Sequence, residues 1–225
     1  MTKQFEIDED FEWFLEKFEE PSEKNQAPAE IIKKFEGKLP TRLLEYWSEY
    51  GFSGFGEGLF WLTNPDDYDD TLDAWLGDTD IVEQDTYYVI ARSAFGELFL
   101  WGEKFGHKYL IDPSHGWIIE KEGNAEDIAV GEENDAIQFF FSAKRPTSLD
   151  INDTSGGLLF GKCKLRLSQL KYNEMYAFEP AFFLGGQPTI DNVSKVNIFA
   201  HLSVLASFGQ KEILDQQGLI AKAYS

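Results

Sequence analysis

Residues 39–77, LPTRLLEYWSEYGFSGFGEGLFWLTNPDDYDDTLDAWLG, contain the signals that decide the fold. Pro40 suits the start of a helix, where its missing N–H would be unpaired anyway. Apolar residues then recur at the spacing of one helical face: Leu43, Leu44, Trp47 and Tyr50. Four glycines between 51 and 58 allow a compact loop around Phe52 and Phe55, and the apolar run 59–62 is typical of a buried strand. The stretch predicts a helix, a tight turn and a strand.

Residues 64–77 predict a second helix with clear ends. Asn64 can cap its first turn, and Gly77 is expected to close it in the left-handed conformation. The apolar face comprises Tyr68, Leu72, Trp75 and Leu76. Four carboxylates are left on the outer face: Asp66, Asp69, Asp70 and Asp73. Because like charges four residues apart repel, by about 0.2–0.5 kcal/mol per pair, this acidic face suggests a requirement other than folding.

The remainder of the chain predicts an α+β protein. Apolar spacing indicates an amphipathic helix over 8–19 and a short helix over 31–37. From residue 86, four short apolar runs separated by turn residues indicate an antiparallel meander, and 132–142 indicates a helix that covers one face of the sheet. Residues 174–180 alternate as in a strand. Residues 196–208 fit both the strand and the helix period, and the pattern leaves that choice open.

Two divisions of the chain are compatible with these patterns. The first separates a helical, acidic part, 1–85, from an α+β part, 86–225, in which an antiparallel sheet carries covering helices. The second extends the first part to about residue 143, so that it includes the meander. Residues 144–155 are polar and contain Pro146, as a linker would.

Composition and charge exclude several classes of function. The net charge is −20, and residues 1–85 hold 23 acidic against 7 basic side chains. Nucleic-acid phosphates and anionic membranes both attract basic surfaces, so neither is an expected partner. A lone cysteine, Cys163, forms no internal disulfide, and no membrane-spanning run or signal segment is found. The cytoplasm is therefore the expected location.

No catalytic or metal-binding motif emerges. Counting a calcium loop from Asp67 places Leu72 where the loop needs glycine, so no metal site is predicted. Cys163 and the three histidines, His107, His115 and His201, lack the spacing of a nucleophile and base. We therefore expect a protein that is not an enzyme and uses no cofactor.

Longer segments resemble a known family. The stretch LPTRLLEYWSEYGFSGFGEGLFWLTNPDDY resembles the GAD-like domain. Three further segments resemble the region that follows it in bacterial immunity proteins of type VI secretion: RSAFGELFLW (92–101), YLIDPSHGW (109–117) and EMYAFEPAFFLGG (174–186). The resemblance implies a protein that binds and neutralises a secreted DNase toxin, the product of a neighbouring gene. It carries no catalytic residues over to this chain.

The charge pattern is compatible with that role. A nuclease holds DNA on a positive surface, which an acidic inhibitor would meet with complementary charge. We expect the toxin-binding surface to combine Asp66, Asp69, Asp70 and Asp73 with neighbouring Phe52 and Phe55. Two alternatives stay open: a small-ligand-binding protein or enzyme with a pocket between the two parts, lined by Trp61, Trp101 and Trp117, and a scaffold whose acidic face serves solubility.

Overall fold

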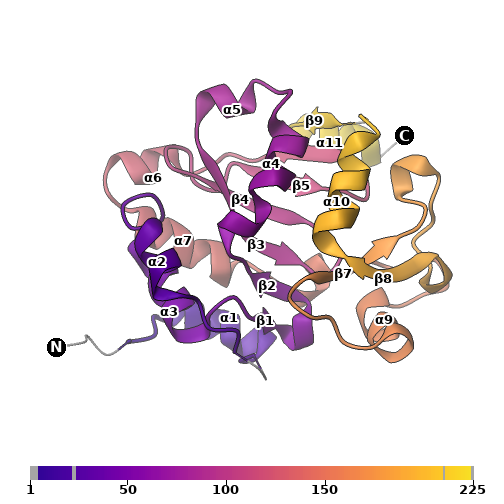
Figure 1. Ribbon diagram of the computed structural model, residues 1–225, viewed down its shortest axis with the longest axis horizontal. Coiled ribbons are helices and arrows are strands. Elements are labelled where there is room, and N and C mark those ends of the chain that lie inside the picture. The colour runs from indigo at the N-terminus through magenta and orange to yellow at the C-terminus, as the bar shows by residue number, and fades with distance from the viewer. Residues whose placement is uncertain (1–4, 22–23, 210, 224–225) are drawn as a thin grey trace.

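The computed structural model describes residues 5–21, 24–209 and 211–223, and a seven-stranded sheet forms its centre (Figure 1). The strand order is β1-β2-β3-β4-β5-β6-β9, and every pairing is antiparallel except the parallel pair β6 and β9. The strands are β1 Gly54–Phe55, β2 Phe60–Leu62, β3 Tyr87–Ser93, β4 Leu98–Gly102, β5 Tyr109–Asp112, β6 Trp117–Glu120 and β9 Glu212–Leu214. The predicted meander is thus confirmed as β3 to β6.

The sheet is buried on both faces, so its strands are apolar almost throughout. Successive side chains of a strand point to opposite faces. In β4, Leu98 and Leu100 enter one core while Phe99 and Trp101 enter the other. A bulge between Val89 and Ala91 of β3 interrupts the register with β4. Two separate cores therefore lie on the two sides of one sheet.

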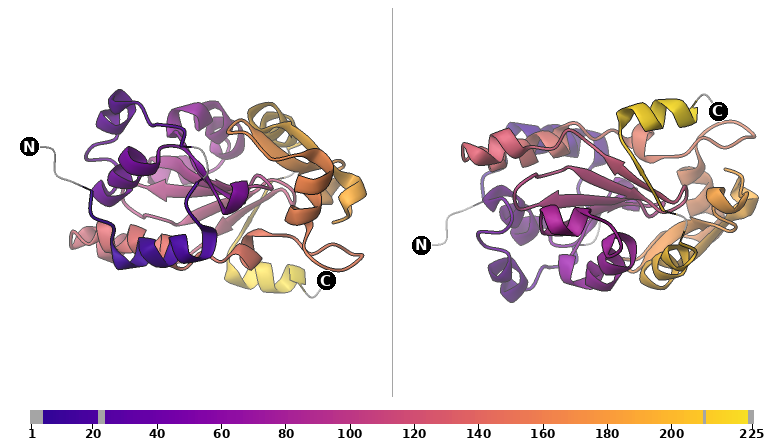
Figure 2. Two further views of the ribbon diagram at one scale, coloured as in Figure 1. Left: turned by 90° about the horizontal axis from the view of Figure 1, so that it is seen from below. Right: turned by 90° about the horizontal axis from the view of Figure 1, so that it is seen from above.

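Helices form a layer on each side of the sheet (Figure 2). The helices α1 Glu9–Phe18 and α7 Glu133–Ser142 cover one face, and α3 Thr41–Tyr50 packs against both, with Tyr46 stacked 3.9 Å from Phe11. The helices α4 Asp69–Leu76 and α10 Ile198–Ser207 cover the opposite face. The shorter helices are α2 Ala29–Lys34, α5 Ile81–Gln84, α6 Ala125–Ala129, α8 Pro146–Leu149, α9 Leu159–Leu167 and α11 Gln216–Ala223.

A second, two-stranded sheet joins β7 Glu174–Phe178 to β8 Val193–Asn197. The segment 196–208, which fits both periods, divides between the end of β8 and α10. Asn197 marks the change, because its Oδ1 accepts a hydrogen bond from Ala200 N at 3.0 Å and so caps the helix. Strand and helix patterns therefore overlap in the sequence because the two elements adjoin.

The mixed α+β class and the main helices are confirmed. Asp8 caps α1 by accepting a hydrogen bond from Phe11 N at 2.9 Å. The expectation for Gly77 was wrong, because its φ of −56° and ψ of −29° are right-handed and its N–H still bonds to Asp73 O. The chain turns two residues later, where Thr79 N donates to Leu76 O at 2.8 Å.

The sheet runs across residue 85, since β2 pairs with β3. Residues 144–155 are folded onto the body, with α8 in their centre and Leu149 and Asp153 buried. A division at 85, at about 143 or within 144–155 stays a prediction.

Candidate functional site

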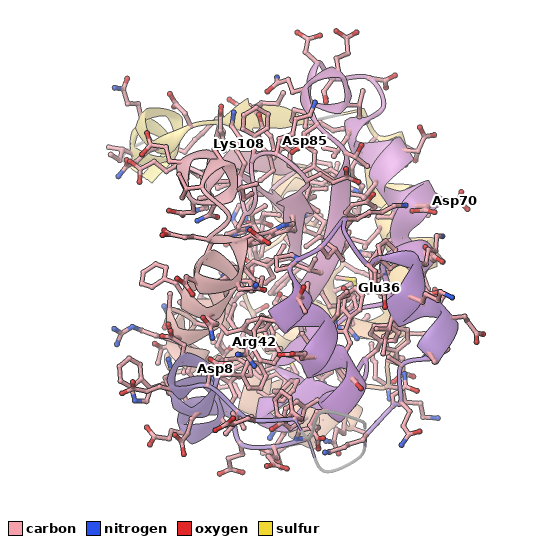
Figure 3. All side chains as sticks on the ribbon, turned by 90° about the vertical axis from the view of Figure 1, so that its left-hand side faces the viewer. Asp8, Glu36, Arg42, Asp70, Asp85 and Lys108 are labelled. Atoms are coloured by element: carbon pink, nitrogen blue, oxygen red, sulfur yellow. The ribbon has the colours of Figure 1, made fainter. Side chains whose placement is uncertain are left out.

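The acidic face begins in a 3-10 helix, Pro65–Tyr68, that continues into α4. Asn64 Oδ1 accepts a hydrogen bond from Asp66 N at 3.3 Å and starts the turn. Trp75 then fixes the rotation of α4, because its buried indole N–H donates to Leu202 O of α10 at 3.2 Å. With Tyr68 and Leu76 also buried, the aspartates of this segment face outward; Figure 3 shows Asp70 pointing away from the body.

The four aspartates are not equivalent. Asp66 is half-buried and pairs with Lys34 of α2, whose Nζ lies 2.6 Å from Asp66 Oδ1. Asp69, Asp70 and Asp73 are exposed, and no side chain in the described ranges forms an ion pair or hydrogen bond with them. Partial burial and the neighbouring charge of Asp66 raise the pKa of Asp69. Three like charges therefore lie unneutralised on one helix.

Phe52 and Phe55 do not lie beside these carboxylates. Their side chains are 3% and 0% exposed and belong to the core on the opposite side of the sheet from α4. Phe52 packs edge-on against Trp47 at 5.3 Å, and Phe55 packs against Phe14 at 5.2 Å. The glycine-rich loop folds these rings inward, so the prediction that they share a contact surface with the aspartates is inconsistent with their burial.

A cavity of about 270 Å³ lies beside Asp73 instead. Three apolar side chains, Leu72, Leu76 and Val82, form part of its wall, and Val82 is 50% exposed. The remaining wall comes from Asp85, Thr86 and Tyr87, at the junction of α5 and β3. The strand pattern of Tyr87 indicated burial, but no sequence signal placed it near Asp73.

A second cavity, of about 490 Å³, includes one of the three tryptophans expected to line a pocket. Trp117 lies there with Phe182 and Phe183, and the ring of His115 stacks on Trp117 at 4.3 Å. His115 Nδ1 is 2.6 Å from Asp112 Oδ2, in the turn before β6. Trp61 and Trp101 are 8% and 1% exposed and contribute to the core.

Cys163 is fully buried in α9, and this burial raises the pKa of its thiol to about 12. The thiol therefore stays protonated at neutral pH, which opposes a role as nucleophile. His107 is half-buried, on the face of the sheet covered by α7, and its ring lies 4.8 Å from that of Phe140.

Sequence reasoning missed one group of perturbed side chains around His107. Burial raises the pKa of Glu97, lowers that of Lys144 to about 7 and lowers that of His107 to about 3. The Lys144 ammonium lies 3.8 Å from the ring centroid of Phe140 and 4.2 Å from that of Phe99. The two cavities described above are lined by other residues.

Within residues 5–21, 24–209 and 211–223, no group of three or more His, Cys, Asp or Glu side chains is placed to hold a metal ion. Over the same ranges, no helix has the length and apolarity to cross a membrane.

Comparison with known families defines the class of protein. Residues 9–114 match the GAD-like domain, and residues 134–209 match the family described as T6SS immunity protein Tdi1, C-terminal. These are the two families that the resemblance implied, and they match successive segments of the chain. The second match supports a role in immunity.

The crystal structure of Atu4351 from Agrobacterium tumefaciens has the same fold. The two structures superpose with a TM-score of 0.75 at 21% identity, and the alignment covers 92% of each chain. No curated protein matches the chain.

Proposed function

We propose that this protein is a cytoplasmic immunity protein that binds and neutralises a cognate antibacterial toxin, a DNase delivered by type VI secretion, without catalysing a reaction. The observation that carries the proposal is the match of residues 134–209 to the Tdi1 immunity family. The GAD-like region and the immunity-family region share one hydrophobic core, since side chains of both regions pack in one cluster.

The charge distribution supports a basic nuclease as partner. A DNase needs a positive surface to hold the phosphate backbone. Asp69, Asp70 and Asp73 present unneutralised carboxylates in the strongly acidic first part of the chain. Complementary charge raises the rate of encounter and disfavours acidic partners.

The contact surface we propose is the outer face of α4, with Asp66 and its partner Lys34 at its edge. Val82 and the half-buried Leu72 supply its apolar portion in place of Phe52 and Phe55. Desolvated apolar contacts of this kind govern how long a complex lasts, whereas the charges govern how fast it forms.

Co-expression tests this proposal. Cells that produce the toxin should survive when the wild-type chain is present, and the purified pair should form a complex that weakens as salt rises.

The triple variant Asp69→Asn, Asp70→Asn, Asp73→Asn should associate at least tenfold more slowly at low salt. The matched control removes the same charge from exposed positions of α1, the helix that covers the opposite face of the sheet: Glu9→Gln, Glu12→Gln, Glu16→Gln. Equal association rates for the two triple variants would place the contact elsewhere.

The cavity at Trp117 favours a second candidate, a small-ligand-binding protein. Residues distant in the chain meet there, with His115 and Trp117 lining the cavity together with Phe182 and Phe183, which lie in the immunity-family match. Native mass spectrometry of the purified protein tests this candidate. A retained small molecule, displaced by the substitution Trp117→Ala, would support it.

A further inference from the structure

The cavity between α4 and α5 has one apolar side and one polar side. Leu72, Leu76 and Val82 can cover the methylene stem of a long side chain. Asp73 and Asp85 lie where the polar end of such a chain would arrive. Asp85 is 6% exposed and is fixed by backbone donors, since its Oδ2 accepts hydrogen bonds from Lys104 N at 2.8 Å and Phe105 N at 3.0 Å.

Tyr87 is a buried part of this wall. The side chain is 7% exposed, and its hydroxyl has no hydrogen-bond partner within the described residues. Its ring needs the bare backbone of Gly102, because a Cβ there would lie 2.6 Å from Tyr87 Cε1 and 2.3 Å from Asp85 Oδ2. Packing against Gly102 therefore holds Tyr87 and Asp85 in place on the polar side of the cavity.

None of the described residues that line this cavity is a cation. Lys34 is held by Asp66, and the Lys104 ammonium donates to Gln84 O at 3.4 Å. No described side chain pairs with Asp73. Among the described residues, the site therefore combines two carboxylates and an apolar wall with no counter-ion in its lining.

We propose that this cavity receives an arginine side chain of the toxin, a specific anchor within the acidic contact surface. The inference rests on the proposed function, because the toxin is the basic partner that would supply the residue. A guanidinium fits better than an ammonium, since its planar set of N–H donors can pair with both oxygens of the exposed Asp73 carboxylate. Its stem packs between Leu72 and Val82.

A first experiment tests the cavity without the toxin. The probe is N-acetyl-L-arginine methylamide, titrated into the ¹⁵N-labelled full chain, and the matched neutral probe is N-acetyl-L-citrulline methylamide. We expect saturable amide shifts at Val82, Thr86 and Tyr87 with the arginine probe, and binding about tenfold weaker both for the citrulline probe and in the variant Asp73→Asn. Equal binding of the two probes, or no saturable shift at these amides, would overturn the proposal.

A second experiment uses the toxin in a catalytically inactive form. Val82→Trp fills the cavity from an exposed position, so the fold is retained, and it should accelerate dissociation at least tenfold. Asp73→Asn, which removes the exposed carboxylate of the cavity, should accelerate dissociation about fivefold. The control Val130→Trp adds the same side chain at the exposed end of α6 and should dissociate as the wild type does.

The outcomes separate the two proposals. If the wild type fails to protect cells or to bind the toxin, the proposed immunity function is wrong. If the wild type protects and Val82→Trp dissociates as slowly as Val130→Trp, immunity stands and the arginine anchor is refuted.

Discussion

Arg92 Nη2 donates a hydrogen bond to the main-chain oxygen of Tyr172 at 2.8 Å, and this contact links the GAD-like region to the immunity-family region. The Arg92 side chain is fully buried, and its guanidinium lies 4.7 Å from the ring centroid of Trp61. Tyr172 also accepts a hydrogen bond from Asn64 N through its hydroxyl at 2.9 Å. Burial lowers the pKa of Arg92, which has carbonyl oxygens as hydrogen-bond acceptors.

Replacing Arg92 should destabilise the whole molecule. Arg92→Ala leaves a cavity and unpaired buried carbonyl groups, and we expect it to lower the free energy of unfolding by about 3 kcal/mol. Urea unfolding at neutral pH measures this change. Arg166→Ala is the control, because Arg166 forms an exposed pair with Asp191 at 2.6 Å that should contribute less than about 1 kcal/mol. Equal losses in both variants would contradict the structural role of Arg92.

Two glycines should respond oppositely to alanine. Gly161 lies inside α9 with no atom within 4 Å of an added Cβ, so Gly161→Ala should stabilise the protein by about 0.5–1 kcal/mol. At Gly186 an added Cβ would lie 1.8 Å from Pro180 O, a backbone atom. Gly186→Ala should therefore destabilise by at least about 2 kcal/mol, since the clash cannot be relieved by a side-chain rotation. Thermal unfolding of both variants checks the two signs.

Stability should depend on Lys144 above neutral pH. Burial lowers the Lys144 pKa to about 7 in the folded protein, with Lys121 acting in the same direction and Glu97 opposing, while the unfolded chain keeps the ordinary value near 10.5. Between these values the unfolded state binds a proton that the folded state lacks, so this residue's contribution to stability rises with pH from about 7. The wild type should gain stability relative to Lys144→Met between pH 7 and 9.

The exposed Lys33 provides the control for that profile, since Lys33→Met should leave the pH dependence of the wild type unchanged. Parallel stability profiles for the wild type and Lys144→Met would show that Lys144 keeps its ordinary pKa in the folded protein.

Single aspartates on the acidic face should differ in their effect on toxin association. Asp70→Asn removes an unneutralised exposed charge and should lower the association rate about twofold at low ionic strength. Asp66→Asn should have a smaller effect, because Lys34 already neutralises that carboxylate at 2.6 Å. Stopped-flow mixing at two salt concentrations compares them. A larger effect at Asp66 would contradict the charge distribution described here.

Much of the fold could be read from local pattern. The helices α1, α3, α4 and α7 and the strands β3 to β6 follow from periodicity and turn residues, because both act within a few positions. The outward direction of Asp70 follows equally, since the apolar residues of its helix fix the opposite side. The negative net charge was compatible with the toxin partner that the family resemblance implied.

Tertiary packing decided the rest. Apolar spacing shows that Phe52 and Phe55 face a core, but which of the two cores they enter depends on how the loop folds beneath α1 and α3. Two further features depend on the docking of separate elements. Asp66 pairs with Lys34, 32 residues away in the chain, and Asp73, Val82 and Tyr87 meet in one cavity. The sequence by itself determined an α+β protein with an acidic helix face, because those properties are local. The structure alone determined which acids of this face remain unpaired and which residues line the cavity beside them, because such contacts join residues distant in the chain.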